Sequence, residues 1–252
     1  MYTSRTFADW FMVGRCIMRK NNTMPGIAIV NNHTYDEAEL AECITNHGSY
    51  INDLTEDFIH HYLNKKDVTQ MWFRIDMVSA LQRITGNLCK EYEWIENIIP
   101  PFTYTRQHIL DTADIEDTSL LIKDYLSMLY KRFDYYYPDN KSEMTQRVIR
   151  YVLGRPFEKH VLSEIAAFMG INHTYLSHSF KGDVGISFVD YCNHYKIDSI
   201  KMLLLYSDLS IKEIANKLKY DDDKYMGRLF KNIVGVPPSK YRKYYKNHFY
   251  NF

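Results

Sequence analysis

The sequence is poor in the residues that build disulfide frameworks, zinc ribbons and many-stranded β folds. Among its 252 residues there are only four cysteines, seven prolines and ten glycines. The cysteines, at Cys16, Cys43, Cys89 and Cys192, are widely scattered and form no CxxC pair. This spacing excludes a disulfide framework and a zinc ribbon, and it fits a reducing, cytoplasmic location.

Catalytic signatures are also absent from the sequence. It contains no GxSxG, Walker loop, HExxH or GxGxxG motif. Cys43 and His47 have the spacing of a ligand pair on a helix, but no second pair accompanies them, so two ordinary side chains are favoured over a metal site. We therefore expect neither an enzyme nor a bound metal or cofactor.

Long apolar runs are absent as well. The stretch from Phe7 to Ile17 is apolar, but Asp9 and Arg15 interrupt it and it falls well short of a membrane span. No small-residue cleavage site follows it. We interpret it as an amphipathic helix and expect no membrane association.

The chain has no net charge, because 31 Lys and Arg balance 31 Asp and Glu, but the charges are unevenly distributed. Residues 1–140 carry 13 Lys and Arg against 20 Asp and Glu, whereas residues 141–252 carry 18 against 11. The halves are therefore formally −7 and +7. This asymmetry predicts a basic module for a polyanion and a separate acidic module.

The first 140 residues are expected to be helical, since four glycines and four prolines are too few for a barrel or sandwich of short strands. Apolar residues recur there at helical spacing in three series, each predicting a helix with one buried face: Ile44, Ile51, Leu54, Phe58, Ile59 and Leu63; Trp72, Ile75, Val78, Leu81, Ile84 and Leu88; and Leu121, Tyr125, Met128, Leu129 and Phe133. Ile27–Val30 is the one candidate strand, and Pro100-Pro101 marks a break between helices.

A domain boundary is predicted at Tyr137–Ser142, which is polar, contains Pro138 and lies where the charge balance changes sign. It divides an all-α chain into a helical regulatory or dimerisation domain, 1–139, and a second domain, 140–252. Aromatic residues of the first domain are candidates for an apolar pocket, although plain core is favoured: Phe7, Trp10, Phe11, Trp72, Phe73, Tyr92, Trp94, Phe102 and Tyr104.

The second half of the chain contains two copies of one sequence motif. Tyr175–Gly185 returns fifty residues later as Tyr225–Gly235, with Tyr, Phe, Lys, Val and Gly in register. A Glu-Ile-Ala step precedes each copy at an offset of forty-nine, so the second copy has gained one residue in the turn between. A duplicated helical unit predicts the same contact made twice along a repetitive ligand, for which duplex DNA is the obvious candidate.

Helix signals flank both copies and predict two helix-turn-helix units. Ser210 and Glu213 form a capping box before the second unit, whereas Val161 provides no cap before the first. A continuous helix, Phe188–Ser207, joins the units. Lys219 stands where the turn favours glycine, which predicts either a left-handed lysine or a different turn.

These residues resemble the DNA-binding signature of the AraC/XylS family of transcriptional regulators over roughly the last 100 residues. The positions that carry the resemblance are Ile165-Ala166, Tyr175-Leu176, Phe180-Lys181, Gly185, Glu213-Ile214-Ala215, Tyr225, Arg228-Leu229-Phe230-Lys231, Gly235 and Pro238-Ser239-Lys240-Tyr241-Arg242. The resemblance implies two recognition helices on one linker helix, entering successive major-groove segments roughly 34 Å apart.

The candidate DNA-binding residues follow from their positions on the two predicted recognition helices. They are His173, Thr174, Ser177, His178 and Lys181 in the first, and Lys224, Gly227, Arg228 and Lys231 in the second. Arg228 is the best candidate for reading guanine, since a guanidinium can bond O6 and N7 together. Gly227 weakens its helix by about 1 kcal/mol and offers no side chain to a base.

The sequence thus predicts a non-enzymatic transcriptional regulator whose partner is double-stranded DNA. RNA polymerase, a small-molecule effector and a second copy of the chain through the N-terminal domain are further candidate partners. Two alternatives stay open: a DNA-repair type of enzyme with an appended AraC-type module, and a protein-interaction module that has lost DNA reading. The scattered cysteines speak against the first alternative.

Overall fold

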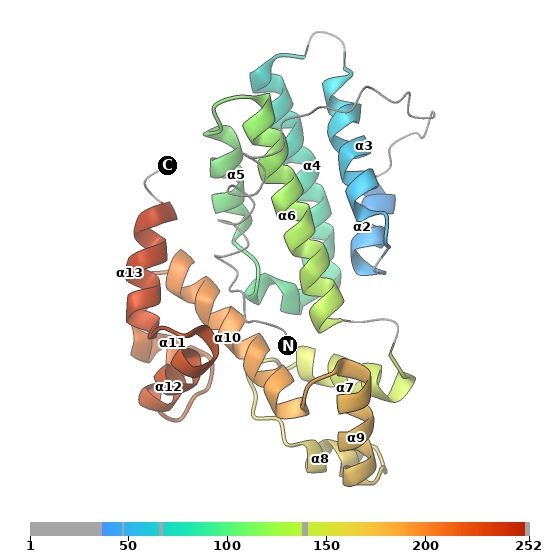
Figure 1. Ribbon diagram of the computed structural model, residues 1–252, viewed down its shortest axis with the longest axis vertical. Helices are drawn as coiled ribbons and strands as arrows, with labels where there is room; N and C mark the ends of the chain where they lie inside the picture. Colours follow the sequence, from blue (N-terminus) through green and yellow to red (C-terminus); the bar gives the residue numbers. More distant parts are fainter. Residues whose placement is uncertain (1–36, 47, 66–67, 138–140, 250–252) are drawn as a thin grey trace. The chain divides into compact units, whose positions relative to one another are not determined.

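The computed structural model describes residues 37–249 apart from 47, 66–67 and 138–140. Within this part of the chain every regular element is a helix, which confirms the all-α prediction (Figure 1). The helix predicted from Phe7 and the strand predicted from Ile27 lie outside the described residues, as do three of the aromatic residues considered for a pocket, Phe7, Trp10 and Phe11.

The described residues form two compact units. The N-terminal unit holds the residues up to Leu88 together with Phe102–Lys131, and the C-terminal unit holds Cys89–Pro101 and the residues from Arg132 onward. The division therefore falls inside two helices of the chain, α4 and α6, whose bounds are Gln70–Glu91 and Ile115–Tyr136.

The N-terminal unit is built on amphipathic helices with one buried face each. Besides most of α4 and α6 it contains α2 (Glu37–Thr45), α3 (Ile51–Leu63) and α5 (Phe102–Leu110). Its fully buried side chains include Leu40, Phe58, Phe73, Met77, Leu81 and Leu126. The pattern of three- and four-residue steps is the physical reason for these helices, because it gathers the apolar residues on one side.

One member of the predicted apolar series does not belong to the buried face. Trp72 is 62% exposed, whereas its neighbour Phe73 is fully buried. Successive helical residues point about 100° apart. The buried face of α4 therefore begins at Phe73 and continues through Met77, and the prediction for Trp72 is wrong.

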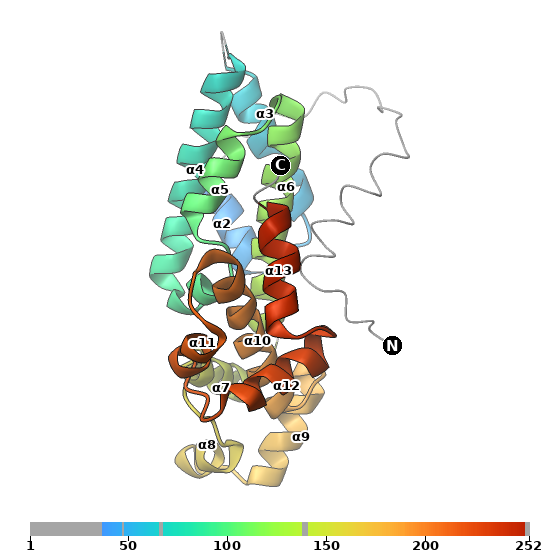
Figure 2. The same cartoon turned by 90° about the vertical axis from the view of Figure 1, so that its left-hand side faces the viewer.

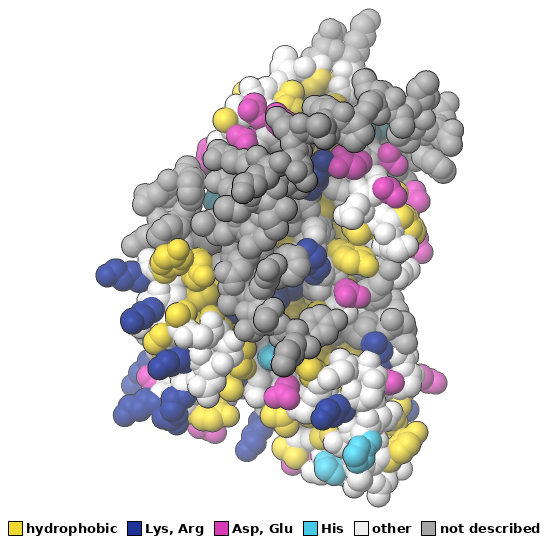
Figure 3. Space-filling model, in the orientation of Figure 1, with side chains coloured by type: hydrophobic (Ala, Val, Ile, Leu, Met, Phe, Trp, Pro, Cys, Tyr) yellow, Lys and Arg dark blue, Asp and Glu magenta, His cyan; other side chains and the backbone are white. Residues whose placement is uncertain are grey.

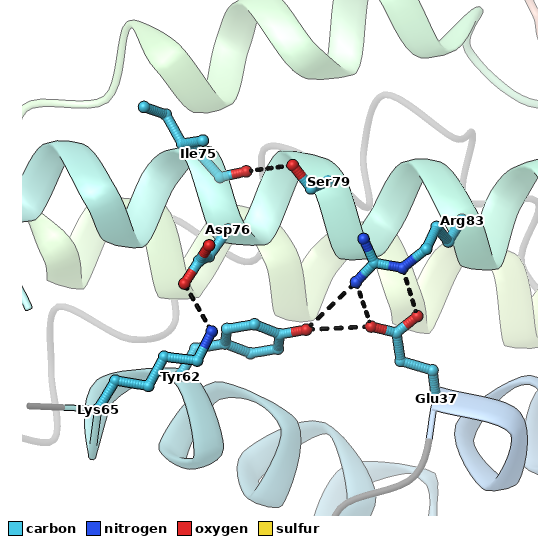
Figure 4. Close-up of polar contacts among 7 residues, drawn as sticks. All are labelled: Glu37, Tyr62, Lys65, Ile75, Asp76, Ser79 and Arg83. Atoms are coloured by element: carbon cyan, nitrogen blue, oxygen red, sulfur yellow. Dashed lines mark hydrogen bonds and ion pairs between the residues drawn. The ribbon is translucent and has the colours of Figure 1, made fainter.

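A polar cluster joins three helices of the N-terminal unit (Figure 4). Arg83 on α4 donates from Nε to Glu37 Oε2 at 2.9 Å, and the Tyr62 hydroxyl of α3 donates to Glu37 Oε1 at 3.0 Å. The hydrogen bond from Arg83 holds the pKa of Glu37 below its usual value. Burial, reinforced by the Glu37 carboxylate, raises the pKa of Tyr62 to about 12. The cluster thus holds α2 against α3 and α4.

The C-terminal unit carries the duplicated segment. Its elements are η1 (Glu93–Asn97), α7 (Glu143–Leu153), α8 (Leu162–Phe168), α9 (His173–Val184), α10 (Phe188–Tyr206), α11 (Ile211–Lys217), α12 (Asp223–Val234) and α13 (Pro238–Phe249). The long helix α10 connects the α8–α9 pair to the α11–α12 pair and contacts α9, α12 and α13 (Figures 1 and 2). The predicted joining helix is thereby confirmed.

A buried ionic cluster lies on α10 of the C-terminal unit. Asp198 is 9% exposed; it accepts hydrogen bonds from Lys201 Nζ and from the Tyr136 hydroxyl, both at 2.8 Å, and is ion-paired with Arg132. Burial alone would raise the pKa of Asp198, but the two cations outweigh it and hold that pKa well below the usual range. Nearby, the Tyr195 hydroxyl donates to the carbonyl of Trp94 at 2.6 Å.

Candidate nucleic-acid interface

Two helix-turn-helix units of the same construction lie at either end of α10. In the first, Leu176 and Phe180 of α9 are fully buried, and in the second the corresponding Met226 and Phe230 of α12 are fully buried. Phe230 packs edge-on against Tyr241 of α13, with ring centroids 5.4 Å apart. These matched apolar residues of the repeat therefore serve the fold.

The two turns close in the same way although one of them lacks glycine. The amide of Ile171 donates to the carbonyl of Ala166, and the amide of Tyr220 donates to the carbonyl of Ala215, both at 2.9 Å. Gly170 has φ 68° and Lys219 has φ 56°. Of the two outcomes predicted for Lys219, the left-handed lysine is the one found.

The extra residue of the second copy lies between the turn and the recognition helix. Tyr220 is followed by two residues up to the N-cap Asp222, whereas Ile171 is followed at once by the N-cap Asn172. Both recognition helices then run for 12 residues and end at a left-handed glycine, Gly185 with φ 84° or Gly235 with φ 90°. The insertion leaves the length of the recognition helix unchanged.

The helix caps agree with the sequence. Ser210 accepts a hydrogen bond from the amide of Glu213, whose carboxylate in turn accepts one from the amide of Ser210 at 2.7 Å, so the predicted capping box is confirmed. At the corresponding start of α8, Val161 makes no side-chain cap.

The residues proposed to face DNA lie on the surface of the recognition helices. Those of α9, which are His173, Thr174, Ser177, His178 and Lys181, are all exposed. On α12, Lys224, Arg228 and Lys231 are exposed and Gly227 is half-buried. Because residues four and seven apart share a helix face, Lys224, Arg228 and Lys231 form one cationic stripe. Their counterparts Thr174, His178 and Lys181 form a less charged stripe on α9.

The second helix-turn-helix unit carries most of the positive charge of this surface. Figure 3 shows Lys and Arg side chains gathered over α11, α12 and α13. The exposed cations of this region are Lys212, Lys217, Lys219, Lys224, Arg228, Lys231, Lys240 and Lys243. Lys224, Arg228 and Lys231 are among the residues predicted from the sequence, whereas the other five cations were missed. A count of Lys and Arg along α11 and α13 would have found most of those five. Such a surface can attract a polyanion.

Arg228 is available to a ligand. Its guanidinium lies 3.9 Å from the Asp222 carboxylate, and the Arg228 side chain is 68% exposed. An ion pair at that distance on the surface contributes little. To contact DNA, Arg228 would therefore have to give up only its weak ion pair with Asp222.

Two polar anchors hold the recognition units in place. Asp183 of α9 accepts a hydrogen bond from the Thr145 hydroxyl of α7 at 2.6 Å, and hydrogen bonds from Ser142 and Thr145 lower the pKa of Asp183. Arg242 of α13 donates to the carbonyls of Leu204 at 3.0 Å and of Leu209 at 2.6 Å, at the end of α10. Both anchors lie behind the exposed faces and serve the fold.

The described cysteines do not form a reactive site. Burial raises the pKa of Cys43, raises that of Cys89 to about 11 and raises that of Cys192 to about 12, so all three are thiols at neutral pH. Cys43 donates to the carbonyl of Gly48 at 3.4 Å, while its predicted neighbour His47 lies outside the described residues. In the part of the chain that the structure describes, no group of three or more His, Cys, Asp or Glu could hold a metal ion.

None of the helices between residues 37 and 249, the undescribed gaps aside, combines the length and the apolar character needed to cross a membrane.

In comparison with known proteins, the duplicated segment matches the model of a protein family. Residues 165–244 match a family model described as a helix-turn-helix domain. An uncharacterized HTH-type transcriptional regulator of Bacillus subtilis (strain 168), YtdP, is 38% identical over 96 residues, which are 38% of this chain and 12% of that protein. The uncharacterized HTH-type transcriptional regulator SACOL0084 of Staphylococcus aureus (strain COL) is 24% identical over 240 residues, which cover 89% of this chain and 32% of that protein.

Among solved structures, the C-terminal domain of AraT, a response regulator from Geobacillus stearothermophilus, is 30% identical and aligns with a TM-score of 0.40, covering 42% of this chain and 88% of that one. The chain spans no more than about a third of the length of the two curated relatives named above.

Proposed function

We propose that this chain, whose residues 165–244 form an AraC-type helix-turn-helix domain, is a sequence-specific DNA-binding regulator of transcription. The observation that carries the proposal is the pair of matching recognition helices, α9 and α12, each with its apolar side buried and its polar side exposed. A helix of this kind fits the major groove of duplex DNA.

Within the interface we assign different roles to the exposed residues. Arg228 reads guanine through a bidentate contact, and Thr174, Ser177 and His178 read bases from α9. The flanking groups His173, Lys181, Lys224 and Lys231 hold phosphates, and Gly227 lets the backbone of α12 approach the groove. The assignments rest on exposure and on the shared helix faces.

The remaining parts of the proposal concern the whole chain. We assign residues 140–252 to DNA binding and residues 1–139 to regulation or dimerisation, with no catalytic activity in either. The acidic balance of the first segment supports a role away from DNA, because like charge repels the phosphate backbone. RNA polymerase, an effector and a second copy of the chain are the candidate partners of this first segment.

The test begins with selection of duplexes from a randomised pool by the full chain, followed by footprinting of the DNA that flanks its own gene. Affinity for a selected duplex is then measured by fluorescence anisotropy at several salt concentrations. We expect affinity to fall steeply with salt, because Lys and Arg release counterions when they bind phosphates. Arg228→Ala should weaken binding to the selected duplex by about 1–3 kcal/mol and relax selectivity at one base pair.

The matched control is Arg106→Ala, which removes the same charge from an exposed site on α5. It should leave affinity for the selected duplex within about twofold, as expected for a distant surface charge. Binding that does not weaken with salt, or that Arg228→Ala and Arg106→Ala reduce equally, would contradict the proposal.

A further inference from the structure

The repeat provides an internal comparison, since a residue that recurs in both copies serves either the shared fold or a shared contact. Leu176 and Phe180 recur as buried residues, and Gly185 recurs as a left-handed cap, so the fold accounts for all three. The matched tyrosine differs from them. Tyr175 is 63% exposed; Tyr225 contacts the ring of Tyr220, with centroids 6.3 Å apart, and is still 50% exposed, so packing inside the protein leaves at least half of this tyrosine in solvent in either copy.

The two tyrosines occupy the same backbone position. The amide of Tyr175 donates to Asn172 Oδ1, and the amide of Tyr225 donates to Asp222 Oδ2, both at 3.1 Å. Each tyrosine is therefore the third residue of its recognition helix, in a turn fixed by the cap. The inserted residue of the second copy lies before the cap and does not disturb this equivalence.

The position on the helix surface indicates what the tyrosines face. Tyr175 follows Thr174 and Tyr225 follows Lys224, so each ring points about 100° away from the stripe that would meet the bases. It thus lies at the rim of the exposed face. When a helix lies in a groove, the centre of its face meets base edges and the rim meets the sugar-phosphate walls.

The chemistry of the side chain agrees with that placement. Neither hydroxyl is hydrogen-bonded to another described residue, whereas the hydroxyls of Tyr62, Tyr136 and Tyr195 are. A phenolic O–H is one donor on a rigid, partly apolar ring, and it can donate to a phosphate oxygen without adding charge.

We infer that Tyr175 and Tyr225 are an equivalent pair of phosphate-binding residues, one on each recognition helix, which position the two helices in successive groove segments. The inference rests on the proposed function, since it requires that α9 and α12 enter the groove. It adds two hydroxyl groups to a surface whose other assigned phosphate contacts are His173 and three lysines.

The test replaces each hydroxyl while keeping the ring, as Tyr175→Phe, Tyr225→Phe and the double variant in the full chain, with Tyr50→Phe as a matched control on another exposed tyrosine. Binding to a selected and to a random duplex is measured against salt. We expect each substitution to weaken binding about tenfold, because the lost hydrogen bond has a charged acceptor. The double variant should lose about a hundredfold, since the two sites do not share partners.

Three readouts separate this role from others. The slope of log affinity against log salt should stay unchanged, because a hydroxyl releases no counterion, whereas Lys224→Ala should reduce it by about one. The loss should be equal for both duplexes, because a phosphate contact does not depend on sequence. The urea midpoint should stay unchanged, because Phe keeps both rings and with them the contact between residue 225 and Tyr220. Normal binding by the Phe variants, a sequence-dependent loss, or a lowered midpoint would each overturn the inference, whereas a wild-type chain that binds neither duplex would overturn the proposed function itself.

Discussion

At the scale of single residues, Asp198 is the carboxylate at the centre of the buried ionic cluster of the C-terminal unit. It faces Arg132 and Lys201, whose side chains are only 12% and 10% exposed, so solvent can do little to replace the carboxylate. Removing one partner of a buried ion pair leaves an uncompensated charge, which costs far more than the pair contributes when it is intact.

We therefore predict that Asp198→Asn lowers the free energy of unfolding at pH 7 by about 3 kcal/mol, measured by urea denaturation. The control Glu91→Gln removes an exposed carboxylate and should change the free energy of unfolding by less than about 0.5 kcal/mol. An equally small effect of Asp198→Asn would show that the cluster is not closed in solution.

The same residue sets a pH dependence of stability. Because the pKa of Asp198 is lower in the folded chain than in the unfolded chain, the folded state binds fewer protons. The stabilisation by this carboxylate is thus present above the unfolded pKa of about 3.9 and is lost as the pH falls further. In urea melts at decreasing pH, the free energy of unfolding of the Asp198→Asn variant should lack the part of the acid-induced decrease that protonation of Asp198 causes in the wild-type chain.

At the scale of the element, α12 is weakened by a glycine that its own packing does not require. A Cβ built on Gly227 meets nothing within 4 Å, and the residue lies inside the helix. A glycine at such a position allows close approach of the backbone to a ligand.

We predict that Gly227→Ala raises the free energy of unfolding by about 1 kcal/mol through helix propensity alone. The contrasting control is Gly235→Ala at the end of the same helix, where φ is 90° and an alanine should destabilise by about 1 kcal/mol or more. Thermal or urea unfolding of both variants checks the pair. A stability loss at Gly227→Ala would mean that α12 is packed more closely than described.

At the scale of the whole molecule, the proposed functional boundary after residue 139 and the compact C-terminal unit do not coincide. The unit also includes Cys89–Pro101 and the residues from Arg132. Those segments supply Trp94, whose carbonyl binds Tyr195, and both Arg132 and Tyr136, which bind Asp198. The segment proposed to bind DNA is thus completed by the chain that precedes it.

We predict that a fragment of residues 140–252 is less stable than the same segment in the full chain, and that Asp198→Asn destabilises the fragment much less than it destabilises the full chain. Without Arg132 and Tyr136 the carboxylate keeps only Lys201 and gains access to water, so its replacement should cost below about 1 kcal/mol, against about 3 kcal/mol in the full chain. Urea melts of the full chain and of the fragment, each with and without Asp198→Asn, form a double-mutant cycle. Equal costs in fragment and full chain would show that the preceding segments do not stabilise α10.

Much of this molecule could be predicted from the sequence because the relevant interactions are local. The capping box of Ser210 and Glu213 spans three residues, and the buried Phe180 and Phe230 follow from helical spacing within the repeat. The exposure of the α9 and α12 stripes follows from the same spacing, since burying one side of a short helix leaves the other in solvent.

The sequence by itself determined the all-helical content of the described residues, the duplicated helix-turn-helix unit and the polar faces of its recognition helices, since each depends on residues within a turn or two of one another. Only the tertiary structure decided that Trp72 is exposed, that Asp198 pairs with Arg132 sixty-six residues away, and that the matched tyrosines are not core. The physical reason is that burial and charge pairing depend on what packs against a helix, and periodicity within that helix does not specify its neighbour.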